Sequence, residues 1–116
     1  GQDFGDMTAG KFNTACASDS TRMLIGGGYS SSNQTTIETL EIAIKSNSVE
    51  YGDLTTARQT SGASSDCVRY VAPGGSATNV IDYVNIQTGG TAADFGDLTV
   101  VGGSGASTSN CHGGLG

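Results

Sequence analysis

The hexapeptide "EYGDLT" at residues 50–55 is preceded by "DFGDMT" at residues 3–8 and followed by "DFGDLT" at residues 94–99. The aspartate at the fourth position recurs at intervals of 47 and 44 residues. Periods of about 20–50 residues are typical of repeat proteins, in which each period forms one supersecondary unit. We call these three segments the repeated hexapeptide. The 116-residue chain is therefore predicted to contain about two and a half structural units.

The similarity between the units extends well beyond the repeated hexapeptide. An offset of 47 residues places Gly74 and Gly75 on Gly27 and Gly28. Further on, "IETLEIAI" at 37–44 aligns with "IDYVNIQT" at 81–88 at an offset of 44 residues. The three missing residues fall after the diglycine, where a surface loop tolerates a change of length. The predicted units are residues 4–50, residues 51–94 and the partial unit 95–116.

The composition favours strands over helices. Apolar residues make up 35% of the chain and charged residues 14%, with 19 glycines and a single proline. Good helix formers do not gather at a 3.6-residue period, and short apolar runs alternate with glycine, serine, asparagine and threonine. We predict an all-β protein with four strands in each unit. In the second unit the predicted strands are Thr60–Ser65, Val68–Ala72, Val80–Gln87 and Thr91–Phe95.

Each repeated hexapeptide has an aromatic residue, a glycine and an aspartate at its centre. These residues are Phe4, Gly5 and Asp6; Tyr51, Gly52 and Asp53; and Phe95, Gly96 and Asp97. We expect the aromatic ring to fill the gap between neighbouring sheets and the glycine to permit a turn with positive φ. We expect the aspartate to accept hydrogen bonds from amides two residues on. The hexapeptide is thus predicted to be an architectural corner.

The distribution of charged and apolar residues argues against a nucleic-acid partner and against membrane insertion. The formal net charge is −6, and no two of the five cationic residues are adjacent. Binding to nucleic acid needs a cluster of cations facing the phosphates, so no nucleic-acid partner is predicted. No apolar run approaches the roughly 20 residues that span a bilayer, so membrane insertion is not predicted either. The chain has no recognisable signal peptide and begins without methionine, which favours a processed or excised fragment.

The residues that could carry chemistry do not form a recognisable set. His112, the only histidine, follows Cys111, and neighbours on a strand point to opposite faces. The aspartates of the repeated hexapeptide could surround an axis and bind a cation, but no calcium-loop spacing supports this and the architectural reading is preferred. The glycine strings lack the Gly-Lys-Ser/Thr sequence of a phosphate loop. We predict no catalytic residues, no metal site and no cofactor.

The three cysteines are Cys16, Cys67 and Cys111. An odd number without CxxC spacing is a poor basis for either a disulfide framework or a zinc site. We expect buried or half-buried thiols on strands.

The arrangement of these segments resembles the Kelch repeat family. "VRYVAPGG" at 68–75 is similar to the diglycine strand, and "VIDYVNIQTGGTAADFGDL" at 80–98 to the strand pair that follows it. Phe95 stands where this family usually has tryptophan, and Arg58 holds the usual arginine position of the linker. The resemblance implies that each unit is one four-stranded blade of a β-propeller. Because a closed ring usually needs at least about four blades, other chains or a missing continuation would have to complete it.

The composition, with few charged residues and many glycines, serines and threonines, resembles that of the Kelch-like arrays of bacteriophage structural proteins. This resemblance implies a non-enzymatic structural and display module in a virion or tail fibre. Its partners would be other copies of itself, other virion proteins and a host-surface glycan. The residues expected to make surface contacts are Tyr29, Asn33 and Tyr83.

Two other functions fit the same family. A Kelch-type interaction adaptor would hold a partner on one propeller face. An enzyme of the galactose oxidase type would need tyrosine and histidine together as copper ligands, which a single histidine disfavours.

Overall fold

The protein folds into two antiparallel sheets of four strands each. Its computed structural model describes residues 1–59, 62–76, 78–102 and 106–109. These residues include no helix, and so none that could span a bilayer. The all-β prediction is confirmed. Closure into a propeller ring remains a prediction, although four-stranded sheets of this kind are compatible with propeller blades.

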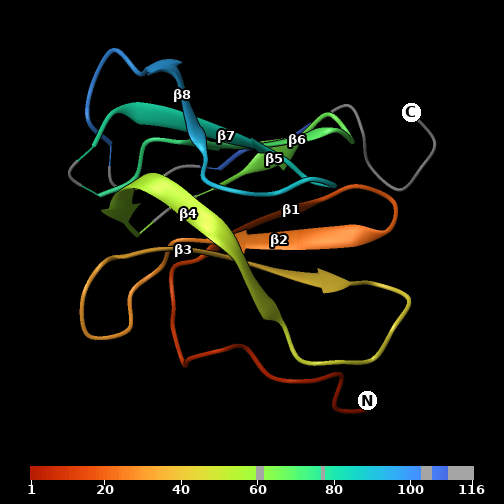
Figure 1. The fold of residues 1–116 in the computed structure, drawn as a ribbon. Coiled ribbons are helices and arrows are strands. Elements are labelled where there is room, and N and C mark those ends of the chain that lie inside the picture. Colours follow the sequence, from red (N-terminus) through yellow and green to blue (C-terminus); the bar gives the residue numbers. More distant parts are fainter. Residues whose placement is uncertain (60–61, 77, 103–105, 110–116) are drawn as a thin grey trace.

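Each sheet is a meander in which strands pair in chain order. Sheet 1 consists of β1 (Ala15–Ser18), β2 (Arg22–Gly26), β3 (Gln34–Glu41) and β4 (Val49–Arg58). Sheet 2 consists of β5 (Ser64–Ser65), β6 (Arg69–Pro73), β7 (Val80–Asn85) and β8 (Ala93–Asp97). Each strand of sheet 2 overlaps one of the four strands predicted for the second unit. Figure 1 shows sheet 2 above sheet 1, with the N-terminal residues below sheet 1.

The sheets end, rather than begin, with a repeated hexapeptide. Residues 50–55 lie in β4, the last strand of sheet 1, and residues 94–97 lie in β8, the last strand of sheet 2. The first hexapeptide, residues 3–8, precedes sheet 1 and belongs to none of its strands. The sequence units and the observed sheets are therefore offset from one another.

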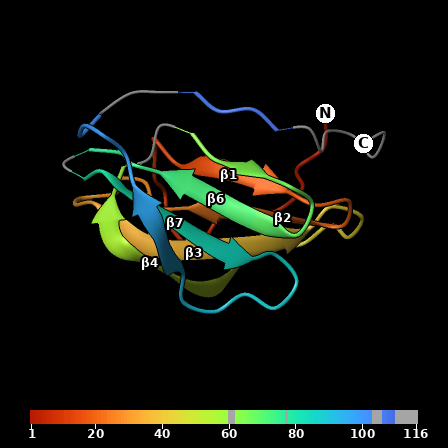
Figure 2. The same ribbon diagram turned by 90° about the horizontal axis from the view of Figure 1, so that it is seen from above.

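The two sheets pack face to face around one apolar core (Figure 2). Sheet 1 contributes Leu24, Ile37 and Leu54, and sheet 2 contributes Tyr70, Ala72 and Val84, together with Ile86 and Ala92 in the loop between β7 and β8. The Tyr70 hydroxyl donates a hydrogen bond to the Ala15 carbonyl, 3.0 Å away in the other sheet. A side chain at Gly26 would meet that hydroxyl, since an added Cβ would lie 2.4 Å from it. Glycine at this position therefore makes room for Tyr70.

The first two strands of each sheet are joined by the same aspartate turn. Asp19 Oδ1 accepts hydrogen bonds from the amides of Thr21 and Arg22, at 2.8 and 2.7 Å. Asp66 Oδ1 accepts them from Val68 and Arg69, at 3.0 and 2.7 Å. These amide bonds favour the charged carboxylate and lower the pKa of Asp66.

The cysteine prediction is wrong for Cys67. It has a φ of 70° beside Asp66, in the turn between β5 and β6 rather than on a strand. It is also disulfide-bonded rather than a free thiol. Cys16 does lie on a strand, β1, and is a free thiol, but it is exposed. Cys111 lies outside the described residues.

The diglycine that follows the second strand has the same backbone in both sheets. Gly27 and Gly28 have φ values of 63° and 101°, and Gly74 and Gly75 have values of 60° and 124°. Such positive values favour glycine because a side chain would clash with its own backbone. The diglycine thus begins the loop between the second and third strands.

Candidate functional site

The second and third copies of the repeated hexapeptide each form a β-bulge and not a turn. Opposite β3, Ile37 pairs with Gly52 and Glu38 pairs with Glu50, so Tyr51 is the extra residue. Opposite β7, Ile81 pairs with Gly96 and Asp82 pairs with Asp94, so Phe95 is the extra residue. The predicted corner is therefore corrected to an irregularity within a strand, which increases twist and redirects one side chain.

In the first two hexapeptides, close approach of another backbone segment requires glycine more than a turn does. A Cβ on Gly52 would lie 1.8 Å from the Gly90 carbonyl oxygen. A Cβ on Gly5 would lie 2.2 Å from the carbonyl oxygen of Ser46, which aligns with Gly90. The expected positive φ is found at Gly5 (150°) and at Gly96 (152°) but not at Gly52. A Cβ on Gly96 would meet nothing within 4 Å.

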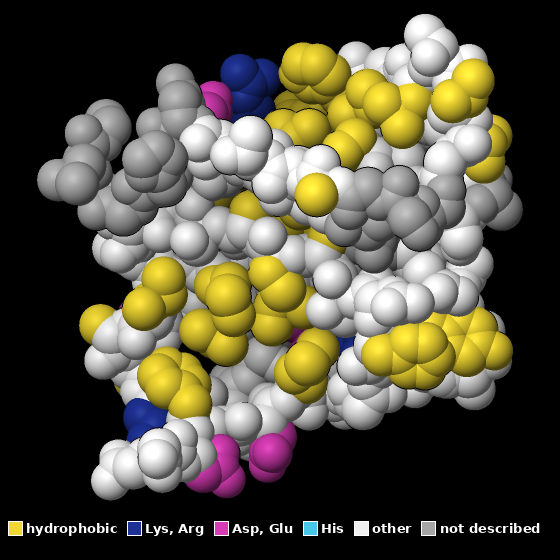
Figure 3. Space-filling model, turned by 180° about the vertical axis from the view of Figure 1, so that it is seen from behind, with side chains coloured by type: hydrophobic (Ala, Val, Ile, Leu, Met, Phe, Trp, Pro, Cys, Tyr) yellow, Lys and Arg dark blue, Asp and Glu magenta, His cyan; other side chains and the backbone are white. Residues whose placement is uncertain are grey.

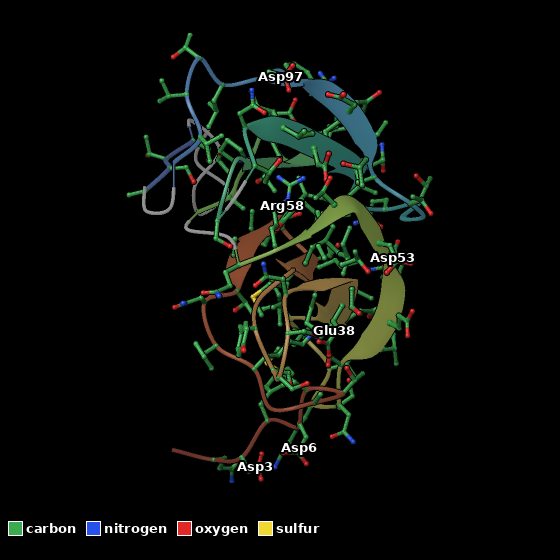
Figure 4. The ribbon with its side chains drawn as sticks, turned by 90° about the vertical axis from the view of Figure 1, so that its left-hand side faces the viewer. Asp3, Asp6, Glu38, Asp53, Arg58 and Asp97 are labelled. Atoms are coloured by element: carbon green, nitrogen blue, oxygen red, sulfur yellow. The ribbon has the colours of Figure 1, made fainter. Side chains whose placement is uncertain are left out.

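The aspartates also act differently from the prediction. The carboxylate that accepts an amide hydrogen bond two residues on belongs to Asp3 and Asp94, at 3.0 and 2.8 Å. Asp6 and Asp53 instead contribute their carbonyl oxygens, which accept hydrogen bonds from the amides of Ser48 (2.9 Å) and Ala92 (2.7 Å). Asp97 is exposed at the end of β8. In Figure 4, Asp6, Asp53 and Asp97 are spread along the molecule and do not converge.

Tyr51 ties sheet 1 to sheet 2. Its hydroxyl lies 3.0 Å from the Ile86 carbonyl oxygen and 2.7 Å from that of Gln87, within donating distance of both. The Arg22 guanidinium lies 5.1 Å from the centre of the Tyr51 ring and also donates to the Gln87 carbonyl. The aligned rings are more open, since Phe4 is 40% and Phe95 59% exposed.

A buried ion pair lies beneath each bulge. Arg58 Nη2 donates to Asp82 Oδ2 at 2.6 Å, and both side chains are fully buried. Arg58 Nη1 donates to the carbonyls of Gly74 and Val80, each at 2.9 Å. Asp82 also accepts hydrogen bonds from the Thr55 amide at 2.8 Å and the Thr55 hydroxyl at 2.6 Å. The arginine therefore links the end of sheet 1 to the middle of sheet 2 (Figure 4).

The same ion pair recurs one unit earlier. Lys11 Nζ contacts Glu38 Oε2, and both side chains are buried. Glu38 Oε1 accepts hydrogen bonds from the Thr8 amide (2.8 Å) and the Ser48 hydroxyl (2.7 Å). Within the described residues, the Lys11 ammonium is the sole partner of Glu38 Oε2. The offsets of 47 and 44 residues relate the two cations and the two carboxylates, respectively.

Sequence reasoning singled out Arg58 but missed its carboxylate partner. Glu38 and Asp82 occupy the same position in the aligned third strands, between residues that read as buried. A carboxylate in such a strand needs a buried cation or several donors, and that signal could have been used.

The residues predicted to make surface contacts lie in two separate places. Tyr29 packs on Phe12 with ring centres 5.4 Å apart, beside the loop that carries Asn33. Asn33 Oδ1 accepts a hydrogen bond from Gln59 Nε2 at 3.3 Å. Tyr83 lies on β7, where its ring meets that of Phe95 edge-on at 5.6 Å. The described residues contain no cluster of three or more metal-ligating side chains.

Burial alone would raise the pKa of Glu38, but the hydrogen bonds from Lys11, Ser48 and Thr8 outweigh it and lower the value from 4.5 to about 2. Because the folded-state pKa is lowered, the stabilisation is complete above pH 4.5 and is lost as the pH falls toward 2. We expect the stability difference between wild type and Glu38→Gln to shrink by up to about 3 kcal/mol over this range.

Urea unfolding followed by circular dichroism between pH 6 and pH 2 measures this difference. The matched control is Glu41→Gln, because the Glu41 side chain is 51% exposed and its contact with Arg22 is long, at 3.5 Å. The Glu41 difference should stay nearly constant with pH. A Glu38 difference that is equally flat would contradict the assigned ion pair.

No protein-family model matches the chain, and no curated protein matches it either.

Proposed function

We propose that this chain is a non-enzymatic structural module of a phage virion or tail fibre, in which stacked blade-like sheets form a scaffold that displays loops. The observation that carries the proposal is the recurrence of one complete joint, made of a bulge, a close glycine contact and a buried ion pair, on both sheets. A joint that repeats at each period suits a module whose role is mechanical. Stability in repeat proteins is the sum of such neighbour contacts.

The loops that follow β2 and β6 lie together at one end of the molecule. This end supports a display role. Asn13, Gln59 and Asn33 form a chain of side-chain hydrogen bonds of 2.8 and 3.3 Å, and Asn33 Nδ2 continues it to Ser76. Asn13, Asn33 and Gln59 lie next to strands of sheet 1, and Ser76 lies in the loop between β6 and β7 of sheet 2. Phe12, which is 59% exposed, lies beside this chain of amides. Exposed aromatic rings next to amide groups suit weak polar contacts with a glycan on a host surface.

Electron microscopy of extracellular particles tests the proposal. Antibodies raised against the purified chain should label intact particles at regular positions, and mass spectrometry should detect the chain in many copies per particle. Antibodies against an unrelated cellular protein provide the control. Recovery of the chain only from cell extract, bound to one partner protein, would contradict the structural role and support the adaptor function.

A further inference from the structure

The outer face of sheet 2 repeats the face that sheet 1 buries against sheet 2. On sheet 1, Leu24 and Ile37 have no exposed surface. Their aligned counterparts on sheet 2, Val71 and Ile81, are only half-buried. Phe95, the counterpart of Tyr51, is 59% exposed. Sheet 2 therefore presents the residues of the interface seen between the two sheets, and no third sheet covers them within the described part of the chain.

The outer face of sheet 1 repeats, in turn, the face that sheet 2 buries. Ile86 is fully buried between the sheets, whereas its counterpart Ile42 is 47% exposed. Val84 is likewise buried between the sheets, whereas its counterpart Leu40 is only half-buried. Hydrophobic side chains also reach the surface in several separate groups on the side of the molecule shown in Figure 3. The two outer faces are thus the two halves of the joint already seen inside the molecule.

Residues 3–8 already occupy part of this site on sheet 1. The Asp6 carbonyl accepts the Ser48 amide as the Asp53 carbonyl accepts the Ala92 amide, at 2.9 and 2.7 Å. The Thr8 amide donates to Glu38 at 2.8 Å. The N-terminal hexapeptide therefore docks on sheet 1 in the way that residues 51–55 dock on sheet 2, although no strands accompany it.

The third hexapeptide, residues 94–99, is identical to the first at five of its six positions. It is held in sheet 2 by β7, but its outward side has no corresponding sheet among the described residues. Gly96 shows this most clearly, because an added Cβ there would meet nothing within 4 Å, whereas Gly5 and Gly52 each face a backbone carbonyl.

We propose that residues 94–99 on the outer face of sheet 2 bind the outer face of sheet 1 of a second copy of this chain. There they would replace that copy's own residues 3–8. This inference rests on the proposed structural role and names the surface through which the module assembles. The interface is heterologous, so successive copies build a ring or a filament.

The side chains across the proposed interface match in size. In the observed joint, Tyr70 of sheet 2 faces Gly26 of sheet 1. The sequence offset puts Met23 of the second copy in place of Tyr70, and Pro73 in place of Gly26. Proline is larger than the glycine that it replaces, and methionine is less bulky and more flexible than the tyrosine that it replaces. The two changes therefore compensate for each other in size.

Competition in the intact protein tests the site. The probe is a synthetic peptide of residues 92–101, titrated into the isotope-labelled full chain and followed by nuclear magnetic resonance. Displacement of residues 3–8 should move the Asp6 and Thr8 amide signals toward positions typical of unstructured chain. Because the tethered segment competes at millimolar effective concentration, half-displacement is expected at about 1–10 mM peptide. The same peptide with Gly96→Ala is the matched control and should displace nothing.

Sedimentation velocity tests the assembly itself. The Gly5→Ala substitution, which expels residues 3–8 from sheet 1, should tighten self-association of the full chain by about tenfold or more. Adding Gly96→Ala or Phe95→Ser to that variant should remove the gain. Phe12→Ser is the matched control, since Phe12 and Phe95 are equally exposed, at 59%, and the Phe12 ring packs on Tyr29 in the loop that follows β2.

The two experiments separate this inference from the proposed function. Displacement by the peptide but not by its alanine form, together with the loss of association in the Gly96→Ala chain, supports the inference. An inert peptide overturns it, and so does association that is indifferent to Phe95 and Gly96. If the chain is nevertheless found in particles, the structural role survives and only the assembly surface is wrong.

Discussion

The Gly52→Ala substitution is expected to destabilise the chain by about 3 kcal/mol or more, enough to leave a domain of marginal stability largely unfolded. The added Cβ would lie 1.8 Å from the Gly90 carbonyl oxygen and 2.5 Å from its carbonyl carbon. Both atoms belong to the backbone, so no flexible side chain can move aside to accommodate it. The Gly90 amide also donates to the Tyr51 carbonyl at 3.1 Å, and any shift that relieves the clash breaks this bond.

Urea unfolding followed by circular dichroism measures the effect, with two alanine variants as controls. Gly10→Ala should change the free energy of unfolding by less than about 0.5 kcal/mol, because an added Cβ there would meet nothing within 4 Å. Gly96→Ala has similar open space but a φ of 152°, so we expect a cost of about 1 kcal/mol from backbone strain alone. If all three variants unfold at the same urea concentration, the close approach is not what requires glycine at position 52.

The repeat, and with it the fold class, could be predicted from the sequence because both depend on local patterns. Short apolar runs between glycine-rich segments predict strands, and the 47-residue offset aligns the two diglycines. The diglycine after the second strand keeps its role in both sheets, since positive φ is a property of its own backbone. The predicted strands of the second unit accordingly overlap β5 to β8.

The bulge could not be predicted because the partner strand decides it. Gly-Asp after an aromatic residue favours a turn when it is read alone. In the folded chain, the register of β3 against β4 places Ile37 opposite Gly52 and Glu38 opposite Glu50. The residue between them is then unpaired, and its side chain is directed at the next sheet. Long-range pairing thus overrides the local preference.

The buried ion pairs were missed for a related reason. Arg58 and Asp82 are 24 residues apart, and only the packing of sheet 1 on sheet 2 brings them together. The sequence marks each member by its recurrence, but it does not say which carboxylate meets which cation.

Removing the charge of Arg58 should cost about 3–5 kcal/mol, because it leaves a buried carboxylate without its cation. In the Arg58→Met variant, Asp82 keeps only the Thr55 amide and hydroxyl as donors. The carbonyls of Gly74 and Val80 lose the guanidinium, although the Val80 carbonyl still accepts a hydrogen bond from the Gly74 amide at 2.9 Å. Urea unfolding again measures the loss. Arg69→Met is the matched control, since Arg69 lies 3.9 Å from Asp66 and both side chains are about half exposed. Its expected cost is under about 1 kcal/mol.

A second substitution separates the cost of the unpaired charge from the cost of the unpaired carbonyls. The Arg58→Met/Asp82→Asn variant has no charge at this site, yet asparagine still offers an oxygen to the Thr55 amide. If the buried charge dominates, the double variant should be more stable than Arg58→Met alone by about 1–3 kcal/mol. A double variant that is no more stable would mean that the arginine acts chiefly as a donor to the Gly74 and Val80 carbonyls.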